Sequence, residues 1–199
     1  MKSFYDFLFR IFNPICNLLY PRRTKMFAQL PEGAAIICAN HTSALDPAFI
    51  SLTVGRQHWI HYMAKAELAS NKRLARLFKR AGVFFVNRSS NDLGAVKTAL
   101  CLLKDGEKIG IFPEGTRVSD DEYVTAKNGA VRFAARLGVP LVPVFVSSSK
   151  KLFRKTDVVV GEAYFVDLNA DISDQTEELM NRIHALNPRR QKNETDSCC

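Results

Sequence analysis

The chain has 199 residues, of which 47% are hydrophobic and 24% charged, so it suits one globular domain with a substantial core and no second catalytic domain. Its 28 basic residues outnumber the 20 acidic ones, and the net charge of +8 favours an anionic partner such as nucleic acid, phosphate or an acidic lipid surface. The five cysteines form no CxxC pair and show no spacing of a disulfide framework or zinc site, which indicates a reducing cytoplasm.

The first segment, residues 1–30, is predicted to be helical and membrane-associating. Its polar residues recur at steps of three and four, so a helix gathers them into one stripe beside a broad apolar face rich in phenylalanine. Arg22, Arg23 and Lys25 follow, a pattern typical of a helix lying among lipid headgroups. The alternative is a helix packed on the protein's own core. Pro14 is expected to kink or divide the helix, and no stretch reaches the roughly 18 apolar residues of a spanning helix.

Short apolar runs alternate with amphipathic segments over residues 31–186. This alternation predicts a single α/β domain with a mixed, largely parallel central sheet flanked by helices. Asp46 is expected to cap one of the helices. The strands are expected at 34–39, 59–63, 83–86, 108–112, 139–146, 157–160 and 163–166, and the helices at 47–54, 71–81, 92–104, 127–137 and 174–186.

Residues 187–199 are polar and are expected to form a disordered tail. The tail ends in Cys198 and Cys199, which lack the four-residue form of the usual prenylation signal, so we expect a mobile end rather than a lipid anchor.

Two predicted strands end in unusual polar segments, residues 40–47 (NHTSALDP) and 113–117 (PEGTR). Ligands of open α/β sheets bind beyond the carboxyl ends of strands, so both segments are placed where a site forms. His41 and Asp46 can meet if the first loop is tight, and the carboxylate then orients and stabilises the imidazole. The alternative is a structural histidine beside an aspartate that merely caps a helix.

The same segment favours direct attack by a substrate hydroxyl, with His41 as general base. Thr42 and Ser43 lie nearby, but neither sits in a strand-to-helix nucleophile elbow. A metal site is disfavoured because third and fourth ligands are not evident in the sequence.

Four blocks in order resemble the 1-acylglycerol-3-phosphate acyltransferase family. Residues 40–47 resemble its NHxSxxDP block and residues 112–117 its FPEGTR block, with weaker blocks at 82–88 (GVFFVNR) and 139–144 (VPLVPV). Residues 34–165 as a whole are therefore similar to this family. One departure is Ala163, which stands where the family often has proline after Gly-Glu.

The resemblance implies a small bacterial enzyme of phospholipid biosynthesis. It would move an acyl chain from a thioester of acyl-carrier protein or coenzyme A to the free hydroxyl of 1-acylglycerol-3-phosphate, giving phosphatidic acid, without a metal or redox cofactor. Another lysophospholipid or glycerol-phosphate acceptor is an alternative, and so is a noncatalytic lipid-binding protein. A nucleic-acid binder is disfavoured because no recognition motif is present.

Carried over residue by residue, the resemblance makes His41 the base and Asp46 its partner. It also implies possible phosphate support from Lys127 with Gly129, and a location at the cytoplasmic face of the membrane as a peripheral or monotopic protein. The basic face of the 71–81 helix would rest on anionic lipid, receive an acidic acyl-carrier protein or simply be solvated. The glycerol phosphate would be bound by Arg88, Glu114, Gly115, Thr116 and Arg117, with Lys65 at the phosphate or the thioester carbonyl.

Overall fold

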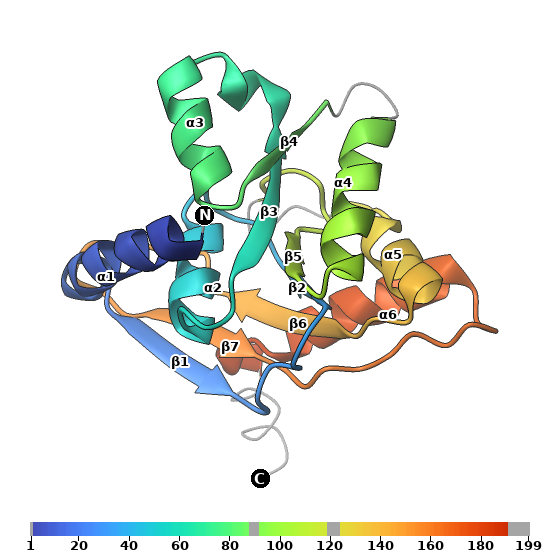
Figure 1. Ribbon diagram of the computed structural model, residues 1–199. Coiled ribbons are helices and arrows are strands. Elements are labelled where there is room, and N and C mark those ends of the chain that lie inside the picture. Colours follow the sequence, from blue (N-terminus) through green and yellow to red (C-terminus); the bar gives the residue numbers. More distant parts are fainter. Residues whose placement is uncertain (1, 88–91, 119–123, 191–199) are drawn as a thin grey trace, which may run out of the picture.

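A computed structural model of the chain describes residues 2–87, 92–118 and 124–190. Within them, a seven-stranded sheet in the order β1-β7-β6-β2-β5-β3-β4 lies between helices (Figure 1). The helices are α1 (Lys2–Leu19), α2 (Asp46–Val54), α3 (Lys72–Arg80), α4 (Leu93–Lys104), α5 (Gly129–Leu137) and α6 (Ile172–Ala185), with a 3-10 turn η1 (Ala66–Ala69). The strands are β1 (Arg22–Met26), β2 (Ala35–Ala39), β3 (Ile60–Lys65), β4 (Phe84–Val86), β5 (Lys108–Ile111), β6 (Leu141–Val146) and β7 (Thr156–Val160).

The sheet is mixed and largely parallel, which confirms the predicted fold class. Strand β2 pairs in parallel with both β5 and β6, and β3 pairs in parallel with β5 and β4. Only the β1–β7 pair runs the other way, because β7 is antiparallel to β6 and β1 is parallel to β7. The carboxyl ends of β2, β3, β4, β5 and β6 therefore meet at one edge of the sheet.

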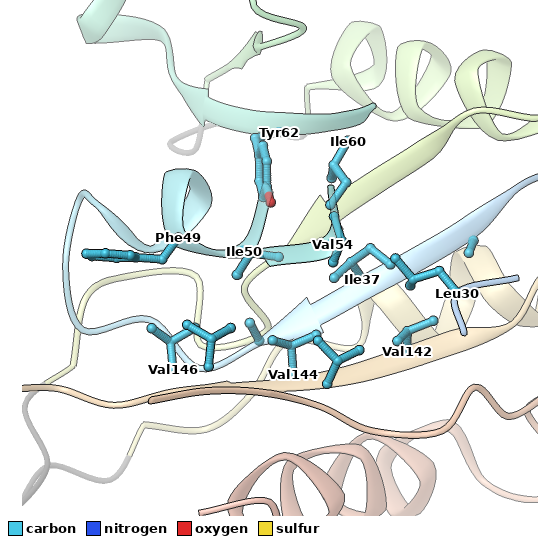
Figure 2. Close-up of a cluster of buried hydrophobic side chains, with 14 residues drawn as sticks. Leu30, Ile37, Phe49, Ile50, Val54, Ile60, Tyr62, Val142, Val144 and Val146 are labelled. Carbon is cyan, nitrogen blue, oxygen red and sulfur yellow. The ribbon is translucent and has the colours of Figure 1, made fainter. Parts of the chain in front are cut away.

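The core lies on both faces of the sheet. Neighbouring residues of β2 feed the two sides, because side chains alternate along a strand: Ile37 joins the cluster with Phe49 and Ile50 of α2 (Figure 2), and Ile36 joins the cluster with α4, α5 and α6. All five residues of β2 are buried. Burying one such large side chain stabilises the fold by about 1.5–3 kcal/mol. The end of β2, where His41 follows, is thus held firmly at the centre of the sheet.

The N-terminal segment differs from its prediction in its second half. Pro14 lies inside a single helix, α1. Strand β1, in a segment expected to be helical, pairs in parallel with β7 at the sheet edge. Its sequence, RRTKM, has no apolar alternation, because an edge strand that exposes four of its five residues needs only main-chain hydrogen bonds.

Two later expectations were also wrong. Residues 163–166 form no strand; Tyr164 makes only an isolated bridge to Leu141, and Phe165 is exposed. Helix α2 starts at Asp46, and its N-cap is Leu45 without a side-chain cap. The Asp46 carboxylate is used elsewhere. Among the described helices, none combines the length and apolar character that crossing a bilayer requires.

Candidate active site

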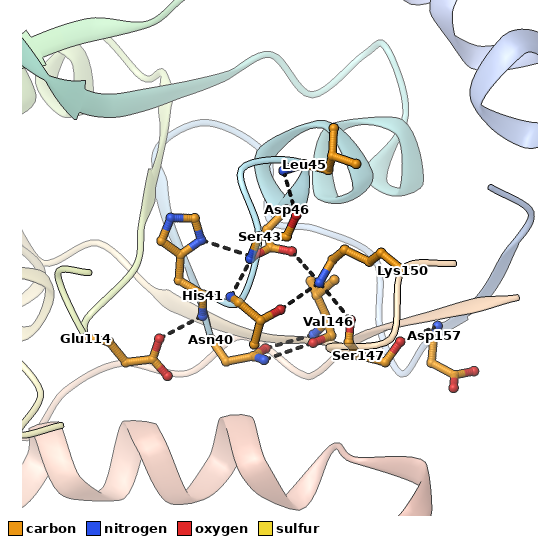
Figure 3. Close-up of polar contacts among 11 residues, drawn as sticks. Asn40, His41, Ser43, Leu45, Asp46, Glu114, Val146, Ser147, Lys150 and Asp157 are labelled. Carbon is orange, nitrogen blue, oxygen red and sulfur yellow. Dashed lines mark hydrogen bonds and ion pairs between the residues drawn. The ribbon is translucent and has the colours of Figure 1, made fainter. Parts of the chain in front are cut away.

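The two polar segments lie side by side at the carboxyl edge of the sheet. They follow β2 and β5, which are neighbours in parallel register. The His41 amide donates a hydrogen bond to Glu114 Oε2 at 2.7 Å, and the Val118 amide donates to the His41 carbonyl at 2.8 Å. The loops predicted to share a site are therefore in direct contact (Figure 3).

His41 and Asp46 form a hydrogen-bonded pair, with His41 Nδ1 2.9 Å from Asp46 Oδ2. The same oxygen accepts from the amides of Thr42 and Ser43, each at 2.8 Å, so the carboxylate clamps its own loop. A carboxylate acceptor at Nδ1 fixes the proton on that nitrogen and leaves the Nε2 lone pair available when the ring is neutral. The imidazole also stacks on Phe112, with ring centroids 4.0 Å apart.

Sequence reasoning missed Lys150, which completes this network. Its ammonium donates hydrogen bonds to Thr42 Oγ1 at 2.6 Å and to the Ser147 carbonyl at 2.8 Å, and it forms an ion pair with Asp46 Oδ1 at 2.8 Å. Its side chain is only 5% exposed and that of Asp46 is fully buried. Burial alone would raise the pKa of Asp46, but hydrogen bonds from His41 and Lys150 and the Lys150 charge together hold it below its ordinary value.

Asn40 ties the Lys150 loop to the end of β2. Its side-chain amide donates to the Val146 carbonyl at 2.9 Å and its side-chain oxygen accepts from the Val146 amide at 2.8 Å. Asn40 thus pairs with the last residue of β6 as a strand residue would. The segment that carries Lys150 begins directly after this bond, so the distance from Lys150 to Asp46 is fixed by the sheet.

Glu114 lies on the other side of the loop from the His41 ring (Figure 3). Burial raises the pKa of Glu114 to about 7, the His41 amide opposes that rise, and the negative charge of Asp46 adds to it. Glu114 and Asn40 line a cavity of about 900 Å³ that extends to Arg189 beyond α6. A carboxyl whose pKa is raised toward neutrality therefore faces this cavity directly behind the loop that carries His41.

Gly115 has a left-handed backbone, with φ of 68°, and lies under the side chain of Lys127. A Cβ atom at Gly115 would stand 2.8 Å from Lys127 Cε, so only glycine fits here without displacing the lysine. The Lys127 amide donates to the Pro113 carbonyl at 2.8 Å. The FPEGTR loop and Lys127 therefore form one unit.

The remaining predicted anion-binding residues are more loosely placed. Thr116 and Arg117 are exposed in the loop after β5, and Lys65 is exposed at the carboxyl end of β3. All three lie at the edge that carries His41. Arg88 lies outside the described residues, as do Cys198 and Cys199.

The described residues contain no group of three or more His, Cys, Asp or Glu side chains arranged to hold a metal ion. The expectation of no metal or redox cofactor stays a prediction.

Fold and site together define an α/β protein with a histidine–aspartate pair and a basic loop at the carboxyl edge of its sheet, an arrangement suited to group transfer from an activated donor. Residues 22–147 match the family model described as Acyltransferase. The chain belongs to the 1-acylglycerol-3-phosphate acyltransferase family.

The individual relatives agree with this assignment. The chain is 39% identical over 167 residues to the 1-acyl-sn-glycerol-3-phosphate acyltransferase of Bacillus subtilis, an alignment that covers 78% of this chain and 82% of that protein. It is 30% identical to the human 1-acyl-sn-glycerol-3-phosphate acyltransferase beta over 63% of this chain and 48% of that protein. The crystal structure of the 1-acyl-sn-glycerophosphate (LPA) acyltransferase PlsC from Thermotoga maritima superposes with a TM-score of 0.68 at 19% identity, covering 94% of this chain and 80% of that one, and supports the fold.

Proposed function

We propose that this protein is a 1-acylglycerol-3-phosphate O-acyltransferase that transfers a fatty acyl group from an acyl thioester to lysophosphatidic acid and forms phosphatidic acid. The observation that carries the proposal is the His41–Asp46 pair, 2.9 Å apart, in a loop that directly contacts the FPEGTR loop. The acceptor and the reaction are those for which its relatives, the 1-acyl-sn-glycerol-3-phosphate acyltransferases, are named.

In this mechanism His41 Nε2 takes the proton of the acceptor hydroxyl while the hydroxyl oxygen attacks the thioester carbonyl carbon. A carbon–oxygen bond forms, the carbon–sulfur bond breaks, and the departing thiolate receives the proton from the imidazolium. Asp46 stabilises the imidazolium, and Lys150 keeps Asp46 ionised and oriented. General base catalysis of this kind contributes about 10²–10⁴ in rate.

The acceptor phosphate is proposed to bind Arg88 and Arg117, whose guanidinium groups offer paired donors to phosphate oxygens. Gly115 and Thr116 let the phosphate approach the loop closely. Glu114 and Lys127 support this loop from behind. Lys65 is proposed to donate to the phosphate or to the oxyanion that forms at the thioester carbonyl.

His41→Ala tests the mechanism. We expect acyl transfer by the purified protein to fall by about 10²–10⁴, because the ring supplies the proton transfer, and circular dichroism verifies that the variant is folded. His58→Ala is the matched control, since His58 precedes β3 at the opposite edge of the sheet and should keep its rate. If His41→Ala transferred acyl groups at the wild-type rate, the mechanism would be refuted. If the wild-type protein bound vesicles but transferred no acyl group, a noncatalytic lipid-binding protein would be favoured.

We further propose that residues 1–30 associate with an anionic membrane at its cytoplasmic face, that residues 31–186 act as the catalytic domain, and that the protein is peripheral or monotopic. Support comes from the net charge of +8 and from apolar side chains of α1 that face solvent. In α3 no residue is buried, and Leu74 and Leu77 are 38% and 41% exposed beside its basic residues. That surface suits lipid or an acidic acyl-carrier protein.

The donor and acceptor classes are tested together by rates measured with acyl-carrier-protein and coenzyme A thioesters against several acceptors. We expect lysophosphatidic acid to exceed both glycerol-3-phosphate and lysophospholipids with larger headgroups. A reversed order would assign the protein to a different acceptor.

A further inference from the structure

The loop between β6 and β7 exposes an apolar pair between cations. Residues 151–155, with the sequence KLFRK, are all exposed, and Leu152 and Phe153 keep 54% and 69% of their surface in solvent. The Arg154 amide bonds the Lys151 carbonyl at 3.1 Å, so the two apolar residues form the tip of a tight turn. This turn lifts two large apolar side chains away from the core.

Phe153 has φ of 59°, the only non-glycine residue among those described with a positive φ. A left-handed conformation costs such a residue about 1–2 kcal/mol. Solvent exposure of its ring gives no packing energy in return. A strained, exposed aromatic residue therefore points to a contact outside the chain.

The turn is attached to α1. The Phe153 amide donates to the carbonyl of Leu19, the last residue of that helix, at 2.7 Å, and Figure 1 shows the loop passing beside α1. Helix α1 is anchored on its other side by Tyr5, which is buried against Trp59. Its exposed side carries an apolar stripe at helical spacing, consisting of Phe7, Ile11, Ile15 and Leu18.

We infer that the Leu152–Phe153 turn and the α1 stripe form one docking surface for an anionic bilayer. Large exposed apolar side chains on two adjoining segments mark an interaction site when they act together. The flanking Lys151, Arg154 and Lys155 match a negatively charged surface, each contributing about 1 kcal/mol near anionic lipid. Apolar side chains ringed by cations are the pattern of insertion into a headgroup layer rather than of a dry protein contact.

The surface deepens the proposed function, because it sets the catalytic edge against the membrane that holds the acceptor. Strands β2 and β6 are parallel, so the turn after β6 lies at the same edge as His41. Lys150, next to the turn, bonds Asp46 directly. A bilayer under Leu152 and Phe153 thus lies beside the site at which a lysophospholipid would present its hydroxyl.

Vesicle sedimentation tests the surface without any turnover. With vesicles of phosphatidylglycerol and phosphatidylcholine, we expect the double variant L152S/F153S to lose about tenfold or more in partition coefficient, because two large side chains no longer leave water. The matched control is F165S/L168S. Phe165 and Leu168 are 68% and 74% exposed, and they follow the Tyr164–Leu141 bridge at the start of β6, which is the opposite edge of the sheet. This control should bind as wild type.

A second readout follows the turn itself. In F153W the added fluorescence should shift to shorter wavelength with vesicles and be quenched by brominated lipid, whereas F165W should do neither. Unchanged vesicle binding by L152S/F153S, or an unshifted F153W, would overturn the inference. The inference would also be overturned if the wild-type protein were a dimer and the L152S/F153S variant were monomeric but still bound vesicles. These readouts need no acyl transfer. A negative result here would therefore overturn the docking surface but not the proposed reaction, which is tested by His41→Ala.

Discussion

The two halves of the site are built differently. The half that contains His41 is closed: Asp46 is fully buried and bonds His41 and the Thr42 amide, and Lys150, whose side chain is 5% exposed, pairs with the Asp46 carboxylate. The half proposed to bind the acceptor phosphate is open: Arg117 is exposed in the loop after β5 and Lys65 is exposed at the end of β3.

This difference fits what each half would have to do in the proposed mechanism. A general base contributes only if it holds its geometry to a fraction of an ångström, and buried, fully hydrogen-bonded groups keep such a geometry before substrate arrives. A phosphate can be met by long, mobile cationic side chains that order around it. Changes in the closed half should therefore affect turnover and stability together, and changes in the open half should affect substrate affinity alone.

The largest effect is expected from Asp46→Asn. An amide in place of the carboxylate cannot stabilise the imidazolium, and it leaves the buried Lys150 without its counter-charge. We expect kcat to fall by about 10²–10⁴. Rates measured under acceptor saturation, with circular dichroism to verify folding, check this. A kcat within a few-fold of wild type would show that the pair is not used in proton transfer.

Lys150→Met should have the next largest effect. It leaves the Asp46 carboxylate buried without a cation, which costs about 3–5 kcal/mol in the free energy of unfolding. We expect kcat to fall by about tenfold to a hundredfold through misplacement of Asp46. Denaturant unfolding and steady-state kinetics measure both. Lys104→Met, at an exposed position that ends α4, is the matched control and should change neither.

The double variant Asp46→Asn with Lys150→Met sharpens the same comparison. Because it removes both charges, its loss in the free energy of unfolding should be smaller than the sum of the two single losses by about 1–3 kcal/mol. Strict additivity would mean that the ion pair does not couple the two positions.

Lys150 also shows where sequence reasoning stops. His41 and Asp46 lie five positions apart in one loop, so their pairing could be predicted from local spacing, and the contact of that loop with residues 113–117 followed from the rule on strand ends. Lys150 stands in a polar run, SSSKK, that has no pattern of its own. Its place depends on β6 being the neighbour of β2, a fact about strand order that no local signal carries.

Similar reasons separate the confirmed elements from the missed ones. Strands β2 and β5 were predicted because buried strands consist of apolar runs. The edge strand β1 was not predicted, because its side chains are exposed and need not be apolar. In α4 the buried face consists of Ala95, Ala99 and Leu103, whereas the larger Leu93 is 77% exposed. The close approach of the helix favours small side chains, which hydrophobicity alone does not rank highest.

Arg117→Gln tests the open half. Loss of a charge-assisted bond to phosphate costs about 1.5–3 kcal/mol, so we expect the KM for lysophosphatidic acid to rise by about tenfold or more with kcat nearly unchanged. An acceptor without phosphate, such as a monoacylglycerol, should show no difference between variant and wild type. Arg136→Gln, at an exposed position on α5, is the control. A fall in kcat alone would place Arg117 in the closed half.

The smallest effect concerns Glu114, which joins the two halves through the His41 amide. Its pKa is raised from 4.5 to about 7, so between these values the folded protein binds more protons than the unfolded chain, and stability must fall as pH rises through that window. Glu114→Gln keeps an oxygen that accepts from the His41 amide but cannot ionise.

We therefore expect the free energy of unfolding to decline between about pH 5 and pH 8 by on the order of 1 kcal/mol more in wild type than in Glu114→Gln. The full pKa difference would give a larger value, but Glu114 lines the cavity, through which water screens the carboxylate. Denaturant unfolding of both proteins across this range measures the difference. Parallel curves would mean that Glu114 is ionised throughout this pH range. Its negative charge would then be balanced in the folded protein, and Glu114 would belong to the open half rather than to the closed half.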